Sequence, residues 1–207
     1  ARAGVFVLDE AEVEALALSP ADRALLRPFY LPGDLPPLGP LPPPRRALLY
    51  LTPTTCPDLR AHPALLRHFA PLRPLLERRR ETRLGYRAYH HLHWPRDEAA
   101  FLGPKLLCVR QAPAPRACLA PGPAFVDLGA NVLRPGPAAP LPLLALAALL
   151  HSAPVLHYLR ARGKRKGPIL QLDAAPLRAL PLPRGDRPEV AALSALGAQI
   201  VAAPSDE

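Results

Sequence analysis

Proline constrains this sequence more than any other residue type, since 31 of its 207 residues are proline. Seven of them fall within residues 32–44. Each proline fixes the backbone φ angle and removes a hydrogen-bond donor, so this segment cannot form a helix or a central strand. We therefore expect residues 32–44 to form an extended polyproline connector on the surface.

The segment before this connector predicts a short strand and two capped helices. Residues 4–8 are a short apolar run, typical of a buried strand. Asp9 and Glu12 have the spacing of a capping box, in which each side chain bonds the backbone N–H of the other residue. Ser19, followed by proline and an acidic residue, predicts a second helix through about Arg27.

After the connector the pattern predicts a strand and a broken helix. Residues 46–52 are rich in leucine and include a tyrosine, which favours a strand. Pro63 suits the first turn of a helix whose apolar residues recur at helical spacing. Further prolines oppose one continuous helix, so we expect a break near Ala70 and a second piece over residues 72–83.

From residue 105 onward, short strand-like runs alternate with turns. The predicted strands cover residues 106–109, 116–120, 125–127, 132–133 and 169–172. Residues 141–162 predict a helix that Pro154 interrupts, residues 163–168 a loop, and residues 177–180 a short terminal element. Helices flanking a mostly antiparallel, hairpin-built sheet place the chain in the α+β class.

The charge of the chain points to a polyanionic partner. Its formal net charge is +9 and its isoelectric point is near 10.2. Residues 60–96 hold nine arginines against two acids, and residues 160–187 hold eight basic residues against two acids. Two separate basic segments would suit a cleft that grips a phosphate backbone, although two solvated faces of a basic protein remain the alternative.

Composition also indicates a setting for the protein. Arginine supplies 23 of the 26 basic residues and asparagine occurs once, as expected of a thermophile with a GC-rich genome. Three cysteines without C-x-x-C spacing favour the cytoplasm of a bacterium or archaeon. The chain does not begin with methionine, and we expect it to be a piece of a longer protein.

Familiar catalytic and metal-binding motifs are absent from the sequence. It contains no Gly-rich phosphate loop, no G-x-S-x-G elbow and no H-E-x-x-H motif. His90, His91 and His93, joined by Cys56 or Cys108, are the best metal candidates, but we expect structural or DNA-contacting histidines and no metal. The chain by itself is thus expected to carry no complete active site.

Two stretches suit nucleic acid, residues 77–89 and residues 160–168. Arginines at the end of a helix, followed by glycine and two tyrosines, combine phosphate pairing with groups that stack on bases or bond their edges. Basic residues in a glycine-bounded loop can approach a phosphate run closely. The predicted contacts to the DNA backbone are Arg78, Arg79, Arg80, Arg83, Arg87, Lys105, Arg162, Lys164, Arg165 and Lys166.

Several motifs in a shared order support a family resemblance. They include Leu75-Leu76-Glu77-Arg78-Arg79, Leu92-His93-Trp94-Pro95-Arg96, Phe101-Leu102-Gly103-Pro104-Lys105-Leu106, Arg110-Gln111, Leu149-Leu150-His151-Ser152, residues 163–167 and residues 177–183. Across roughly residues 45–184 the chain resembles the C-terminal specificity domain, or target-recognition domain, of Taq-like adenine-N6 DNA methyltransferases and type IIG restriction–modification enzymes. His151 departs from the asparagine usual in the family.

The resemblance implies a division of labour. A catalytic domain outside this chain would bind S-adenosylmethionine, use magnesium if the enzyme also cleaves DNA, and methylate a flipped-out adenine. The Asn-Pro-Pro-aromatic motif of that chemistry cannot occur here, because Asn131 is the sole asparagine and valine follows it. Residues 45–184 would then read double-stranded DNA, flanked by an N-terminal part, residues 1–44, and a C-terminal tail element, residues 185–207.

The resemblance also suggests which residues read bases. The candidates for base contacts are Arg110, Gln111, Arg116, Asn131, Tyr86 and Tyr89. Pro168 ends the basic loop and is a candidate wedge that would fill the gap left in the base stack by a flipped base. The alternative is that Pro168 simply ends the loop before the next strand.

Two other functions stay open from the sequence. A basic RNA-binding module fits the charge, although aromatic residues make up only 5% of the chain. A protein-interaction domain would use the proline-rich residues 32–44 to recruit a partner.

Overall fold

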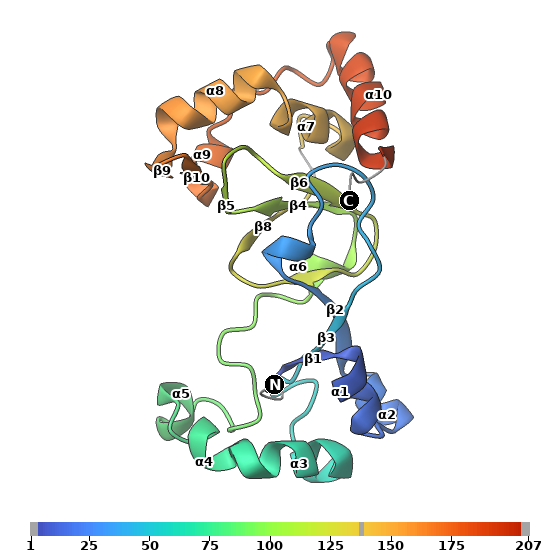
Figure 1. Ribbon diagram of the computed structural model, residues 1–207, viewed down its shortest axis with the longest axis vertical. Helices are drawn as coiled ribbons and strands as arrows, with labels where there is room; N and C mark the ends of the chain where they lie inside the picture. The colour runs from blue at the N-terminus through green and yellow to red at the C-terminus, as the bar shows by residue number, and fades with distance from the viewer. Residues whose placement is uncertain (1–3, 137–138, 204–207) are drawn as a thin grey trace. The chain divides into compact units, whose positions relative to one another are not determined.

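The computed structural model describes residues 4–136 and 139–203 (Figure 1). The chain forms two compact units, each with a core of its own. Unit 1 consists of Ala1–Phe29 and Pro44–Glu98, and unit 2 of Tyr30–Pro43 and Ala99–Glu207. The expected recognition segment, residues 45–184, therefore contributes to both units. Antiparallel strands flanked by helices confirm the predicted α+β class.

Unit 1 is built on three antiparallel strands, β1 (Val7–Asp9), β3 (Arg46–Leu49) and β2 (Leu26–Tyr30), with β3 between the other two. The predicted second helix is shorter than expected. It ends at Arg23 as α2 (Pro20–Arg23), and the following residues form β2 instead. Pairing with β3 overrides the local helical signal.

The predicted helix caps of unit 1 are confirmed. Asp9 accepts a hydrogen bond from the backbone N–H of Glu12 at 2.8 Å, and the Glu12 carboxylate accepts one from Asp9 at 2.9 Å. This capping box opens α1 (Glu10–Ala15). Ser19 and Asp22 form the same motif at the start of α2.

The predicted break near Ala70 is also confirmed. Helix α3 (Pro63–Phe69) passes into a 3-10 turn, η3 (Ala70–Leu72), and then into α4 (Arg73–Leu76), while α5 (Arg80–Arg83) is a separate turn of helix. A further 3-10 turn, η2 (Leu59–Ala61), precedes α3. The core of unit 1 gathers Leu8 and Leu49 from the sheet with Leu65 and Phe69 from α3.

Unit 2 contains two three-stranded antiparallel sheets. The first has the order β6 (Ala117–Ala120), β4 (Lys105–Val109), β8 (Ala130–Leu133). The second has the order β5 (Gln111–Ala112), β10 (Ile169–Gln171), β9 (Lys164–Lys166). The short elements of unit 2 are η1 (Pro32–Asp34), α6 (Ala99–Leu102), β7 (Phe125–Val126) and α9 (Ala174–Arg178). The predicted loop at residues 163–168 is therefore wrong in part, because β9 pairs with β10 to form a hairpin.

Three longer helices belong to unit 2: α7 (Leu143–Leu150), α8 (Ala153–Arg162) and α10 (Glu189–Ala202). Pro154 lies in the first turn of α8, where proline is tolerated, so the predicted interruption falls between two helices. Gly197 lets α10 approach α7 closely, since a Cβ atom there would lie 1.9 Å from the Leu144 carbonyl oxygen. Among the described residues no single helix is long and apolar enough to cross a bilayer, and α7 and α8 meet that criterion only as a pair bent by 69°.

The proline-rich connector is held within unit 2. Apart from η1 it has no helix or strand, as predicted. Leu35 is nevertheless buried, Gly39 donates to the carbonyl of Ile200 at 2.9 Å, and the Tyr30 hydroxyl donates to Pro42 at 3.1 Å. The segment is thus anchored along its length by its own unit.

Candidate nucleic-acid interface

The sheet β5–β10–β9 brings predicted base-reading and phosphate-binding residues into one row. Gln171 on β10 lies opposite Gln111 on β5 and opposite Lys164 on β9. Side chains that face one another across antiparallel strands share a face of the sheet. Gln111 and Lys164 are exposed, whereas the alternate positions Leu170 and Ala112 are buried, so this row lies on the solvent face.

Asp173 ties this row together. Its carboxylate accepts a hydrogen bond from Arg110 Nη2 at 2.7 Å, lies 3.4 Å from Gln171 Nε2 and 3.9 Å from Lys164 Nζ. The hydrogen bond from Arg110 is the largest cause that holds the pKa of Asp173 below its ordinary value. Arg110 also donates to the carbonyl of Leu128 at 3.1 Å, so its guanidinium is fixed at the rim of the row.

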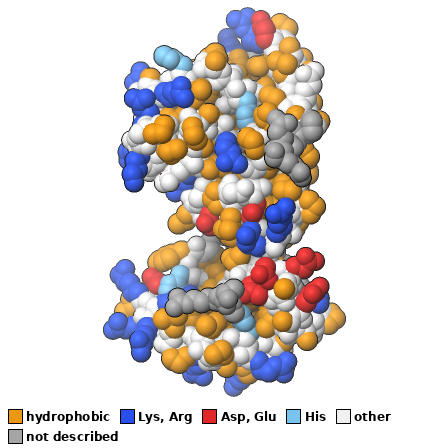
Figure 2. All heavy atoms as spheres, viewed as in Figure 1, with side chains coloured by type: hydrophobic (Ala, Val, Ile, Leu, Met, Phe, Trp, Pro, Cys, Tyr) orange, Lys and Arg blue, Asp and Glu red, His pale blue; other side chains and the backbone are white. Residues whose placement is uncertain are grey.

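The hairpin beside this row is strongly basic. Lys164, Arg165 and Lys166 of β9 are all exposed, and Gly167 makes the turn with φ +60°, a conformation that glycine adopts without strain. Arg160 and Arg162 at the end of α8 are exposed too, and Figure 2 shows blue side chains gathered over this region of unit 2. Charges on an edge strand also oppose pairing with another chain. Pro168 is exposed at the tip of the hairpin, next to Gly167.

In unit 1, the arginines of residues 78–83 divide into exposed and inward-facing side chains. Arg78, Arg80 and Arg83 are exposed. Arg79 turns inward, where its Nη2 donates to the carbonyls of Tyr89 at 2.7 Å and His91 at 2.8 Å. Burial lowers the pKa of Arg79 below its ordinary value. This guanidinium holds a loop in place, which does not favour the predicted contact of Arg79 with the DNA backbone, and that contact stays a prediction.

The loop that Arg79 holds carries the two predicted tyrosines. Gly85, with φ +76°, reverses the chain after α5, and Tyr86 follows with 70% of its surface exposed. Tyr89 is half-buried, and the guanidinium of Arg73 lies 5.1 Å from the centre of its ring. Arg87 is half-buried as well.

Lys105, predicted to contact the DNA backbone, lies inside unit 2. Its side chain is fully buried, and Nζ donates to the carbonyls of Gly103 at 2.9 Å and Gly122 at 2.6 Å. Burial lowers the pKa of Lys105 to about 8. A side chain held in this way joins two loops and is not favoured as a phosphate contact, and the predicted contact of Lys105 with the DNA backbone stays a prediction.

Two further candidates for base contacts are engaged within unit 2. Arg116 donates from Nη2 to the carbonyl of Leu35 and so attaches the proline-rich connector to the sheet. Asn131 donates from Nδ2 to the carbonyl of Leu172 at 2.7 Å and lines a depression of about 140 Å³. Their contacts to bases stay predictions.

His90 and His91 are buried and bonded within unit 1. His90 and His91 both bring Nε2 to the carbonyl of Cys56, at 3.2 and 2.9 Å. Burial lowers the pKa of both histidines and raises that of the Cys56 thiol to about 11. Among the described residues, no three His, Cys, Asp or Glu side chains gather as a metal site.

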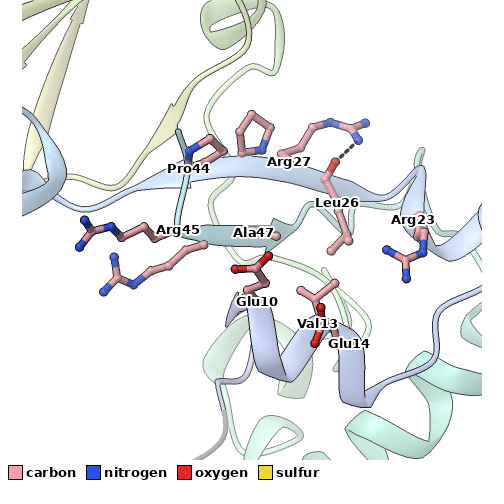
Figure 3. Close-up of a pocket in the computed structure, with 11 residues that line it drawn as sticks. Glu10, Val13, Glu14, Arg23, Leu26, Arg27, Pro44, Arg45 and Ala47 are labelled. Atoms are coloured by element: carbon pink, nitrogen blue, oxygen red, sulfur yellow. Dashed lines mark hydrogen bonds between the residues drawn. The ribbon is translucent and has the colours of Figure 1, made fainter. Parts of the chain in front are cut away.

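A groove of about 460 Å³ in unit 1 was not foreseen from the sequence. Its apolar floor includes Val13, Leu26 and Ala47, and Figure 3 shows Glu10 of α1 directed toward it. Arginines 23, 27, 45 and 46 share the lining with Glu10 and Glu14. Carboxylates repel phosphates, and none of the predicted DNA contacts lies here, so the exposed basic surfaces fit nucleic acid better.

Gln171 and Asp173 were missed as site residues by sequence reasoning. The strand at residues 169–172 was predicted, and alternation along it would have placed Gln171 on the face opposite Leu170. Gln171 pairs with Gln111, which lies 60 residues earlier in the sequence, and no local pattern reveals such a pairing.

No protein-family model matches the chain, and no curated protein sequence matches it. The fold is similar to that of the type IIL restriction-modification enzyme MmeI, solved in complex with DNA, with a TM-score of 0.67 and 13% sequence identity. The similarity covers 94% of this chain and 25% of that chain, so this chain spans about a quarter of its neighbour's length. The chain thus has a fold that occurs within a restriction–modification enzyme.

Proposed function

We propose that this chain recognises a specific sequence in double-stranded DNA, as the target-recognition domain of a restriction–modification enzyme that methylates adenine at N6. The similarity of 94% of the chain to part of a restriction–modification enzyme in complex with DNA supports that class. The resemblance to Taq-like methyltransferases and type IIG enzymes rests on the sequence motifs alone. S-adenosylmethionine, and magnesium where DNA is cleaved, would belong to a catalytic domain of the same parent chain.

The observation that carries the proposal is the row Gln111, Gln171 and Lys164 beside the exposed basic hairpin. Glutamine amides can bond adenine at N6 and N7 in the major groove, while lysine and arginine bind phosphates and set the register. A two-stranded ribbon is narrow enough to enter the major groove. The hairpin therefore combines positioning and reading on one element.

Binding of the 207-residue chain to labelled duplex DNA at several salt concentrations tests this proposal. The variant Lys164→Ala/Arg165→Ala/Lys166→Ala should lower affinity and reduce the slope of log K against log salt by roughly 2 to 3, about one for each phosphate that the variant leaves unneutralised. The matched control Arg184→Ala/Arg187→Ala removes two exposed charges before α10 and should retain most of the affinity. An unchanged slope in the hairpin variant would refute the assignment.

Competition with structured RNA separates the RNA-binding alternative, which predicts tighter binding to RNA than to duplex DNA. The partner-recruiting alternative is not favoured by the packing of residues 32–44, since Leu35 is buried and Arg116 bonds its carbonyl. Leu38 and prolines 37, 40, 43 and 44 are nevertheless exposed, and deletion of residues 32–44 tests this alternative, which predicts loss of complex formation with intact DNA affinity.

Pro168 remains the proposed wedge for the flipped base. Its exposed position at the tip of the hairpin supports this role. In an enzyme that includes the catalytic domain, Pro168→Gly should reduce both methylation and the fluorescence of a flipped 2-aminopurine. If both stay unchanged, Pro168 is a turn residue only.

A further inference from the structure

Three apolar side chains next to the arginines of α5 are exposed to an unusual degree. Trp94 is 79% exposed, Tyr86 70% and Leu84 53%. Large aromatic side chains are normally buried over much of their surface, and exposed ones gathered together mark interaction sites. All three belong to unit 1, and the proposed hairpin contact in unit 2 does not use them.

Glu81 bonds Tyr86 and the residue that precedes Trp94. It lies within α5 and is buried, with 8% of its surface exposed. Its backbone carbonyl accepts a hydrogen bond from Tyr86 at 2.9 Å, and its carboxylate lies 2.7 Å from Nδ1 of His93, the residue before Trp94. Tyr86 and the residue before Trp94, eight positions later in the sequence, are therefore both anchored to Glu81 of α5.

The charge around these aromatics is positive. Arg80 and Arg83 are exposed and three positions apart on α5, so they neighbour one another on the helix surface. Residues 77–98 contain six arginines and four acids, of which Glu77 lies 2.7 Å from Arg73, Glu81 faces His93 and Glu98 pairs with Arg27. The surface formed by Arg78, Arg80, Arg83, Leu84, Tyr86 and Trp94 is named here the aromatic–arginine surface.

We infer that the aromatic–arginine surface binds unpaired nucleotides of a single-stranded nucleic acid. In a duplex the faces of the bases are covered by stacking, so an exposed indole or phenol ring can stack only on a base that has left the helix. Exposed arginines would pair with the phosphates on either side of that base. Complementary charge and free ring faces fit this partner better than they fit an intact duplex.

The inference goes beyond duplex recognition by the hairpin, and each can fail without the other. Trp94 is the sole tryptophan of the sequence, so tryptophan fluorescence of the full chain reports on this surface alone. The probe is a short oligothymidylate, compared with a duplex and with an abasic oligodeoxyribose phosphate of the same length. Stacking should quench the fluorescence, and the oligothymidylate should bind about tenfold more tightly than the abasic strand.

Matched variants identify the residues involved. Tyr86→Ala should weaken oligothymidylate binding about tenfold by removing one stacking ring, and Tyr86→Phe should restore it. Arg80→Gln/Arg83→Gln should weaken binding and flatten its salt dependence, whereas Arg67→Gln, an exposed arginine of α3, should leave it unchanged. Circular dichroism checks that each variant is folded.

The outcomes separate the two proposals. The hairpin variant Lys164→Ala/Arg165→Ala/Lys166→Ala should keep the quenching by oligothymidylate while duplex binding falls. Equal binding of the abasic strand, or fluorescence that no single strand quenches, would overturn the inference. In that case the exposed apolar side chains are a contact for another protein domain.

Discussion

The guanidinium of Arg110 donates to the carboxylate of Asp173 at 2.7 Å and joins the residue after β4 to the residues after β10. The same carboxylate lies 3.9 Å from Lys164 of the basic hairpin. One acid therefore holds a candidate base-reading arginine and moderates the charge of a candidate phosphate-binding strand. This balance between positive charge and orientation leads to the first prediction.

Replacing Asp173 with asparagine should strengthen duplex binding and weaken its selectivity. The change removes a negative charge beside the hairpin and frees Arg110, so we expect affinity at about 0.1 M salt to rise roughly threefold to tenfold for all sequences. Asp186→Asn, the same change at an exposed site, is the control. Binding measured with a random and a selected duplex checks both effects, and equal gains in the two variants would contradict the specific role of Asp173.

The lowered pKa of Asp173 also predicts a dependence of stability on pH. A carboxyl with a depressed folded-state pKa contributes stability that is complete above its unfolded pKa, about 3.9, and is lost as the pH falls through its folded value. We therefore expect the difference in stability between the native chain and Asp173→Asn to shrink below about pH 4. Urea unfolding at about pH 3 and about pH 6 measures it.

Replacing Arg79 should lower the stability of the fold, whereas replacing Arg80 should weaken nucleic-acid binding. Arg79→Ala leaves the carbonyls of Tyr89 and His91 without their donor, and we expect a loss of about 1–3 kcal/mol in the free energy of unfolding. Arg80→Ala removes an exposed side chain and should change stability by less than about 0.5 kcal/mol while weakening nucleic-acid binding. Urea unfolding and binding assays on both variants distinguish the two. Equal effects on stability would contradict the inward role of Arg79.

Lys105 should make the chain more stable as the solution becomes alkaline. Its folded pKa, about 8, lies below its unfolded value of about 10.4, so the unfolded chain binds more protons between these values and stability rises with pH there. Lys105→Met removes this dependence and leaves the carbonyls of Gly103 and Gly122 without their donor. The difference between native and variant unfolding free energies at about pH 7 and about pH 9 isolates Lys105 from the thiols. A difference that does not increase with pH would argue against the lowered pKa.

The facing glutamines predict a change of base preference. Gln111→Ala or Gln171→Ala should relax selection at one position by about 1–3 kcal/mol, the discrimination of a good bidentate contact, with little effect on stability. Gln199→Ala on α10 replaces the third glutamine of the chain, which is exposed like Gln111, and serves as the control. Selection from a pool of randomised duplexes measures the preference. A pattern shared by all three variants would count against readout by this row.

Local physical rules were sufficient for much of the fold. The capping boxes at Asp9 and Ser19, and the break near Ala70, follow from backbone hydrogen bonds and proline geometry within a few residues of chain. Strand pairing over longer distances was not predictable in this way. Residues after Arg23 form β2 because β3, which follows the proline-rich connector, supplies a partner.

What the sequence by itself determined about this protein is its α+β class, its positive charge and the residue types suited to nucleic acid. Only the tertiary structure decided which of these side chains are free to bind it. Three consecutive arginines, 78 to 80, are equivalent in a sequence, yet the carbonyls of a later loop capture Arg79 alone. Lys105 is likewise withdrawn by two carbonyls, while strand pairing places Gln171 beside Gln111. The reason is that charge and periodicity are properties of the local chain, whereas burial and hydrogen-bond partners depend on contacts that form only on folding.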